Sequence, residues 1–73
     1  MQKPKNIAIL GSTGSIGTQA IQVIKENPKI FCAEVLVANS NADLLIQQAL
    51  ELNPNSVVIA DESKYQQVKA AYK

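Results

Sequence analysis

The most constraining feature of the 73-residue chain is a run of apolar residues that leads directly into regularly spaced glycines. Residues 7–10 are all apolar, and Gly11, Gly14 and Gly17 follow at every third position. Consecutive apolar residues of this kind are typical of a strand that is covered on both faces. An apolar pattern at helical spacing begins at Ile16. The segment therefore predicts a buried strand, a tight turn and the first turn of a helix.

The rest of the chain repeats this strand–helix pattern twice, with short polar connections. We expect strands over residues 6–10, 31–38 and 57–60, and helices over 16–26, 42–52 and after Ser63. Strands that alternate with helices through short connections predict a parallel sheet with right-handed crossovers. The position of the glycine turn after the first strand favours an α/β fold. We predict the first half of a three-layer, Rossmann-like parallel sheet with the strand order 3-2-1.

In a complete fold of this kind the first strand is central, but here one of its edges has no partner. An unpaired strand edge is a liability for an independent domain. We therefore expect residues 1–73 to be a single, partial dinucleotide-binding domain. It is either part of a larger enzyme, whose catalytic and C-terminal domains are absent from this sequence, or it covers this edge with another chain.

The helices have recognisable boundaries and inward faces. Asn27 and Pro28 should end the first helix, because the residue before a proline is disfavoured in the α conformation. The apolar residues of the first helix recur at the spacing of a stripe that packs on a sheet: Ile16, Ala20, Val23 and Ile24. In the second helix the corresponding inward residues are Leu45, Ile46, Ala49 and Leu52.

The glycine turn has the features of a phosphate-binding loop. Gly11 lets the chain leave the strand sharply, Gly14 lets the backbone approach a pyrophosphate, and Gly17 lets the helix pack closely on the sheet. The N–H groups of residues 13–16 and the positive end of the helix dipole form an anion site. Hydroxyl groups add further donors at Ser12, Thr13 and Ser15. A tight turn without a ligand is the alternative, and a P-loop is disfavoured because no Gly-Lys-Ser/Thr follows the glycines.

The connection after the second strand indicates which dinucleotide would bind. Enzymes that use NAD place Asp or Glu there, about 20 residues beyond the glycines, to hold the ribose 2′-hydroxyl. This chain has Asn39, Ser40 and Asn41 instead, without an acid. A carboxylate would repel a 2′-phosphate and small polar donors would not, so the sequence favours NADPH. Ser40 or Asn41 can also cap the next helix.

The composition argues against several other classes of function. The net charge is +1, and the seven basic residues are all lysines scattered along the chain, whereas nucleic-acid binding usually relies on arginine. Residues 7–10 are too few for a membrane span or a signal-peptide core, so we expect a cytoplasmic location and no membrane partner. The chain has no histidine and no carboxylate cluster, so we expect no metal site within it.

Three side chains with reactive groups are assigned no catalytic role. Cys32 lies in an apolar run without a histidine base in the chain, and we expect it to be buried on the same face as Leu36 and Ala38. Tyr65 and Lys69 match the Tyr-x-x-x-Lys pair of short-chain dehydrogenases, but that pair occurs much further along the chain in that family. We expect Tyr65 to pack on the core and Lys69 to be solvated.

The run from Ile9 to Ala20 resembles the opening of the 1-deoxy-D-xylulose 5-phosphate reductoisomerase family. The similarity continues through residues 23–28, 36–38 and 57–62 and spans essentially the whole chain. The string Gly-Ser-Thr-Gly-Ser-Ile-Gly, with Asn-Pro after the helix, is more specific than the glycines of Rossmann folds in general. The chain is therefore identified as similar to the N-terminal part of the NADPH-binding domain of this family.

The resemblance implies that two turns contact NADPH. The first contributes Thr13, Gly14, Ser15 and Ile16, and the second contributes Asn39, Ser40 and Asn41. Many family members have Gly and then Lys or Arg where this chain has Asn39 and Ser40, so a basic partner for the 2′-phosphate is absent here.

The resemblance also implies the activity of the parent enzyme. Members of the family are homodimeric enzymes, both oxidoreductase and isomerase, of the non-mevalonate pathway of isoprenoid biosynthesis. It rearranges and reduces a phosphorylated sugar to 2-C-methyl-D-erythritol 4-phosphate, using NADPH and a divalent metal, Mg or Mn. Its metal-binding carboxylates, substrate-phosphate site and mobile loop lie beyond residue 73. We therefore expect no catalytic residue in this chain and no turnover by the chain alone.

The residues by themselves leave three alternatives. The first is another reductase with the same glycine spacing, such as a semialdehyde dehydrogenase or an epimerase-like protein, which the sequence after residue 73 would distinguish. The second is a non-enzymatic NADP-sensing module, which micromolar binding by the isolated chain would indicate. The third is a structural fragment without affinity for a ligand.

Overall fold

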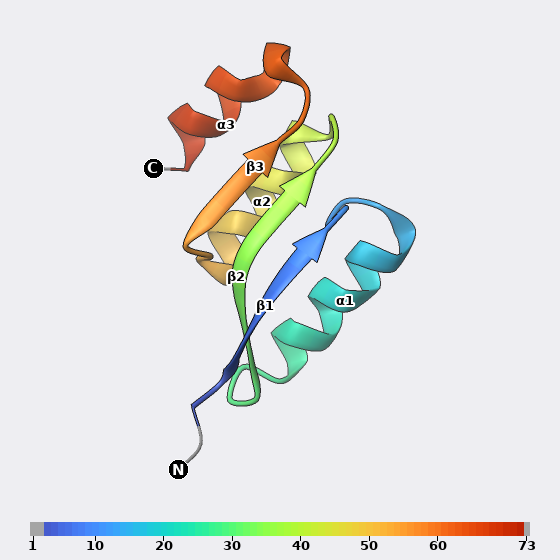
Figure 1. The fold of residues 1–73 in the computed structure, drawn as a ribbon, viewed down its shortest axis with the longest axis vertical. Helices are drawn as coiled ribbons and strands as arrows, with labels where there is room; N and C mark the ends of the chain where they lie inside the picture. Colours follow the sequence, from blue (N-terminus) through green and yellow to red (C-terminus); the bar gives the residue numbers. More distant parts are fainter. Residues whose placement is uncertain (1–2, 73) are drawn as a thin grey trace.

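A computed structural model describes residues 3–72, in which strands and helices alternate (Figure 1). This order confirms the predicted β-α-β-α-β-α pattern, with a short 3-10 helix, η1, before the last helix. The elements are β1 (Lys5–Leu10), α1 (Ser15–Glu26), β2 (Phe31–Ala38), α2 (Ala42–Leu52), β3 (Ser56–Ile59), η1 (Glu62–Lys64) and α3 (Tyr65–Ala71).

The helix boundaries follow the signals expected from the sequence. Asn27 is the C-cap of α1, immediately before Pro28. Asn41 is the N-cap of α2, and Asn53 ends that helix in the left-handed conformation with φ of 52°. Asparagine tolerates this conformation better than most residues because its short polar side chain hydrogen-bonds locally.

The three strands form a parallel sheet in the order β1-β2-β3. This is the predicted 3-2-1 order, and it confirms the Rossmann-like α/β class. β2 is the central strand, so within residues 3–72 the outer edge of β1 has no partner strand. The carboxyl ends of all three strands meet at one edge of the sheet, where the turns that lead from each strand to the next helix also lie (Figure 1).

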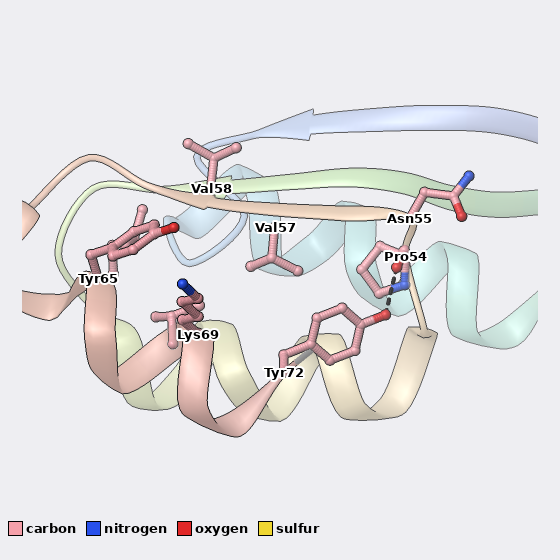
Figure 2. Close-up of a pocket in the computed structure, with 9 residues that line it drawn as sticks. Pro54, Asn55, Val57, Val58, Tyr65, Lys69 and Tyr72 are labelled. Atoms are coloured by element: carbon pink, nitrogen blue, oxygen red, sulfur yellow. Dashed lines mark hydrogen bonds between the residues drawn. The ribbon is translucent and has the colours of Figure 1, made fainter.

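The helices cover one face of the sheet, as seen in the edge-on view of Figure 2. The buried apolar core lies between this face and the helices, and consists of Ile9, Ile21, Ile24, Ala33, Leu36, Ala38, Ala42, Leu45, Ala49, Ile59 and Val68. The other face carries Leu10, which is 78% exposed, and Val58, which points away from the helices. Residues 3–72 therefore form two layers, and the expected covering of the strands on both faces is not present within them.

The inward face of α1 differs from the predicted stripe. Ile16 is 82% exposed and Val23 is 48% exposed, whereas Gly17, Ile21 and Ile24 are buried. The rotation of the helix is set at Gly17, because a Cβ atom there would lie 1.9 Å from a backbone oxygen of the preceding turn. The inward stripe therefore begins at Gly17 rather than at Ile16. In α2 the predicted Leu45 and Ala49 are buried, and Ile46 and Leu52 are partly buried.

The prediction that Cys32 is buried is wrong, because a bulge in β2 changes the alternation of its side chains. Ile7 pairs with Ala33 but Ala8 pairs with Val35, so Glu34 is an extra residue in β2. Ala33 and Leu36 consequently face the same core although an odd number of positions separates them. Cys32 lies before the bulge and is exposed.

Candidate functional site

The two turns predicted to bind a cofactor lie side by side at the carboxyl ends of β1 and β2. The N–H groups of Gly11 and Ser12 both donate to the carbonyl oxygen of Val37, at 2.8 and 2.9 Å. Val37 is two residues before Asn39, so the first turn begins against the strand end from which the second turn departs (Figure 1). In open α/β sheets this edge is where ligands bind.

The three glycines of the first turn differ in whether, and why, the structure requires glycine at their position. Gly11 has φ of +75°, a conformation that disfavours any side chain. Gly17 cannot carry a Cβ atom, because that atom would lie 1.9 Å from the Gly11 oxygen and 2.8 Å from the Ser12 Cα. Gly14 has φ of −80° and ψ of 176°, and a Cβ atom there would meet only the Gly11 oxygen at 3.5 Å. The backbone conformation therefore requires glycine at position 11 and packing requires it at position 17, whereas neither requires it at position 14.

The N-terminus of α1 presents free backbone donors. Gly14 donates to the Gly11 oxygen at 3.0 Å, and Thr18 donates to the Gly14 oxygen at 2.8 Å. The N-cap, Gly14, forms no side-chain hydrogen bond to the helix. Over residues 3–72, no acceptor is found for the N–H groups of Thr13, Ser15, Ile16 and Gly17. These donors and the helix dipole suit a phosphate group.

Most of the predicted residues of the first turn line one open hollow of about 500 Å³. Gly11, Gly14, Ser15, Ile16 and Gly17 line it together with Ala8, Ile9, Leu10 and Ala20. Thr13 does not line this hollow and is half-buried. Ser12 was expected to offer its hydroxyl to a ligand, but it is fully buried and cannot reach one. The hydroxyl donors of this turn are therefore reduced to Thr13 and Ser15.

The second turn exposes all three of its polar residues. The Asn41 Oδ1 atom accepts a hydrogen bond from the Leu44 N–H at 3.2 Å, which confirms the predicted helix cap. In the described part of the chain, the side chains of Asn39 and Ser40 have no hydrogen-bond partner. They remain available to a ligand at this edge.

An acidic residue that the sequence argument did not consider follows this turn. Asp43 lies in the first turn of α2, where it accepts a hydrogen bond from Gln67 Nε2 at 2.7 Å. This bond ties its carboxylate to α3. Sequence spacing could have identified Asp43, but it could not have identified Gln67 on α3 as its hydrogen-bond partner.

A second hollow, of about 530 Å³, lies between β3 and α3 (Figure 2). It is lined by Val57, Val58, Tyr65, Lys69 and Tyr72, among others. Tyr65 is 52% exposed, so its predicted core position is wrong, and the Lys69 Nζ lies 5.9 Å from the centre of its ring. The hydroxyl of Tyr72 donates to the carbonyl oxygen of Pro54. These contacts are a cation–π contact and a hydrogen bond to the backbone, without the convergent N–H donors of the glycine turn.

The described residues offer no metal centre and no membrane span. No three side chains of His, Cys, Asp or Glu within residues 3–72 are grouped closely enough to hold a metal ion. None of the helices in that range is sufficiently long and apolar to cross a bilayer.

One buried polar side chain near the glycine turn was missed by sequence reasoning. Gln48 on α2 is 3% exposed, and its Nε2 donates to the Ser12 oxygen at 2.8 Å. Its position in the helical repeat, three residues after the inward-facing Leu45 and next to Ala49, was the available signal.

The chain contains parallel βαβ units, and at their carboxyl edge it has a glycine turn and an uncapped helix N-terminus. This arrangement is typical of the dinucleotide-binding class of α/β domains. The family model for 1-deoxy-D-xylulose 5-phosphate reductoisomerase matches residues 7–73. The chain belongs to this family.

Curated relatives and a solved structure show the same similarity. The 1-deoxy-D-xylulose 5-phosphate reductoisomerase of Bacteroides fragilis is 59% identical over 69 residues, which are 94% of this chain and 18% of that protein. The enzyme of Elusimicrobium minutum is 48% identical over 65 residues, 89% of this chain and 16% of that protein. The structure of the Zymomonas mobilis enzyme in complex with NADPH matches with a TM-score of 0.90 and 37% identity, over 97% of this chain and 19% of that one. The chain thus spans less than a fifth of the length of these relatives.

Proposed function

We propose that this chain holds NADPH, as the N-terminal part of the NADPH-binding domain of a 1-deoxy-D-xylulose 5-phosphate reductoisomerase. The observation that carries the proposal is Gly14. Its backbone angles are open to any residue, and a Cβ atom there would meet nothing within residues 3–72 closer than 3.5 Å. A glycine at this position, before a helix N-terminus with free N–H groups, is explained by the close approach of a ligand.

The two turns have different roles in this proposal. The backbone donors of Thr13, Ser15 and Ile16 bind the pyrophosphate, while Gly11, Gly14 and Gly17 shape the backbone around it. Asn39, Ser40 and Asn41 lie at the adjacent strand end and hold the adenosine ribose with its 2′-phosphate. The absence of an acid within residues 39–41 supports a preference for NADPH over NADH.

The activity of the whole protein follows from its family and is part of the same proposal. Bound NADPH supplies the hydride for the reduction that accompanies rearrangement of the phosphorylated sugar to 2-C-methyl-D-erythritol 4-phosphate. The residues described here position the cofactor, and the Mg or Mn ligands, the sugar-phosphate site and the catalytic residues belong to other parts of the protein. A homodimer and a cytoplasmic location remain predictions.

The proposal is tested by titrating the chain with NADPH and with NADH. The chain has no tryptophan, so nicotinamide fluorescence can be followed without transfer from indole, and amide chemical shifts locate the site. We expect shifts confined to residues 11–17 and 39–41, and tighter binding of NADPH. Shifts elsewhere would refute the site, and equal affinity for both cofactors would refute the role of the second turn.

A separate assay tests the division of labour. The chain, incubated with 1-deoxy-D-xylulose 5-phosphate, NADPH and Mg²⁺, should oxidise NADPH no faster than a protein-free blank. The full-length 1-deoxy-D-xylulose 5-phosphate reductoisomerase of Bacteroides fragilis serves as the positive control. Turnover by this chain would show that the catalytic groups are not confined to other parts of the protein.

A further inference from the structure

A buried glutamine connects α2 to the glycine turn. Gln48 belongs to the inward face of α2, whose other buried members are Ala42, Leu45 and Ala49. Its side-chain amide donates to the Ser12 oxygen at 2.8 Å, across 36 residues of sequence. A long polar side chain on an otherwise apolar face therefore ends on the backbone of the turn that is proposed to hold the cofactor.

Ser12 is held from three directions. Its N–H donates to the Val37 oxygen at the end of β2, and its carbonyl accepts from Gln48 on α2. Its Cα lies 2.8 Å from the place that a Cβ atom on Gly17 of α1 would occupy. Ser12 is completely buried. The turn is thus fixed at this residue, and only one of the three restraints is made by a side chain.

The carbonyl that Gln48 holds belongs to the same peptide group as the Thr13 N–H. In a trans peptide the carbonyl and the N–H point in opposite directions, and residues 3–72 contain no cis peptide. A hydrogen bond that draws the Ser12 oxygen towards α2 therefore directs the Thr13 N–H away from α2. That N–H has no acceptor within the described residues.

Gln48 is a poor choice if its role is only to fill the core. Its Oε1 atom is buried without a hydrogen-bond partner in the described structure, and so is the Ser12 hydroxyl. An unsatisfied buried polar atom costs stability, and an apolar side chain of similar volume would avoid that cost. The amide supplies something that methionine or leucine cannot, which is a directed hydrogen bond to one carbonyl of the turn.

We propose that Gln48 is a positioning residue, which fixes the peptide between Ser12 and Thr13 so that the Thr13 N–H faces the cofactor phosphates. This inference rests on the proposed NADPH site. It adds a residue outside both turns, on the following helix, that determines how well the first turn binds.

The test compares Gln48→Met with Gln47→Met in the full chain. Both variants place the same side chain on α2, but Gln47 is exposed and makes no hydrogen bond to the turn. Gln48→Met should fold at least as stably as the wild type, shift the Thr13 amide resonance and accelerate its hydrogen exchange. NADPH affinity should fall about fivefold, the size expected when one neutral hydrogen bond is lost. Gln47→Met should change neither quantity.

An unchanged Thr13 amide in folded Gln48→Met would overturn the proposal. If that variant does not fold, Gln48→Glu provides the test, because a protonated carboxyl can donate to the Ser12 oxygen and an ionised one cannot. The Thr13 resonance should then follow the titration of the introduced carboxyl, and a pH-independent resonance would contradict the role. The amide measurements need no cofactor. Failure of the wild type to bind NADPH would therefore refute the proposed function without deciding the role of Gln48.

Discussion

The first and second turns both lead from a strand to a helix N-terminus at the same edge of the sheet, but they satisfy that N-terminus differently. At α2, the Asn41 side chain accepts the Leu44 N–H. At α1, Gly14 stands in the N-cap position and has no side chain to offer. The second helix is thus capped from within the chain, whereas the first keeps its donors free. The difference supports the proposal that a ligand binds at the N-terminus of the first helix.

The two turns also differ in what holds their shape. The first is defined by backbone packing, with the Gly17 backbone pressed against Gly11 and Ser12. The second is an exposed polar segment whose backbone is tied at both ends, by Asp61 N–H to the Asn39 oxygen and Ala42 N–H to the Ser40 oxygen, both at 2.9 Å. Substitutions at Gly11 or Gly17 should therefore damage folding, whereas substitutions in the second turn should affect mainly ligand choice and helix capping.

The largest effect is expected from Gly17→Ala. The new Cβ atom would lie 1.9 Å from the Gly11 oxygen, and backbone on both sides of the contact would have to move. We expect a loss of about 3 kcal/mol or more in the free energy of unfolding, at the upper end for overpacking. Urea unfolding followed by circular dichroism measures it. Gln19→Ala, at an exposed position of the same helix, should change stability by no more than about 0.5 kcal/mol.

Gly14→Ser is expected to have opposite effects on folding stability and on NADPH affinity. The serine Cβ has room, and its hydroxyl can cap α1 as Asn41 caps α2, so stability should stay the same or rise by a few tenths of a kcal/mol. The same side chain would occupy the space and the donors assigned to the cofactor. NADPH affinity should fall at least about tenfold, equivalent to about 1.4 kcal/mol. Undiminished affinity in this variant would remove the main support for the site.

The architecture was predictable because its signals are local. The glycine spacing, the Asn-Pro stop after α1 and the Asn39–Ser40–Asn41 connection each determine a boundary through the backbone preferences of a few residues. The parallel order then followed from the short connections. The free donors of the glycine turn were predictable for the same reason, since they are backbone groups.

The errors concern features that depend on distant contacts. The burial of Cys32 depended on a bulge at Glu34, which becomes apparent only when β2 is paired with β1. The exposure of Ile16 depended on how Gly17 packs against the first turn. The role of Gln48 depended on a bond to Ser12, 36 residues away. Helical or strand periodicity carries no information about contacts between distant residues. An assignment of inward faces from periodicity therefore rests on hydrophobicity alone.

Asn41→Ala tests whether the Asn41 side chain stabilises the N-terminus of α2. It removes the acceptor of the Leu44 N–H and should cost about 1 kcal/mol of stability, typical of an N-cap deletion. The measurement is again urea unfolding, with Gly14→Ser analysed in parallel. If Asn41 did not cap α2, Asn41→Ala would leave the stability unchanged. A loss in Asn41→Ala alone supports the distinction between them.

The smallest effect is expected at the third turn, after β3, where the cap is charged. Asp61 Oδ1 accepts from the Ser63 hydroxyl at 2.7 Å and from the Ser63 N–H at 3.0 Å. The hydroxyl bond and then the backbone bond hold the pKa of this carboxyl below its ordinary value of 3.8. Because the folded pKa is lowered, the stabilisation is complete above the ordinary value and is lost as the pH falls through the folded one.

Asp61→Asn should therefore be slightly less stable than the wild type at neutral pH, and the difference should shrink as the pH falls through the lowered pKa of the wild-type carboxyl. Thermal unfolding measured across this pH range tests the expectation. Glu62→Gln is the matched control, because it removes a charge from the adjacent residue without touching the Ser63 bonds. A pH-independent difference for Asp61→Asn would mean that the shape of the cap, and not its charge, stabilises this turn. In that case the third turn would be equivalent to the neutral cap at Asn41.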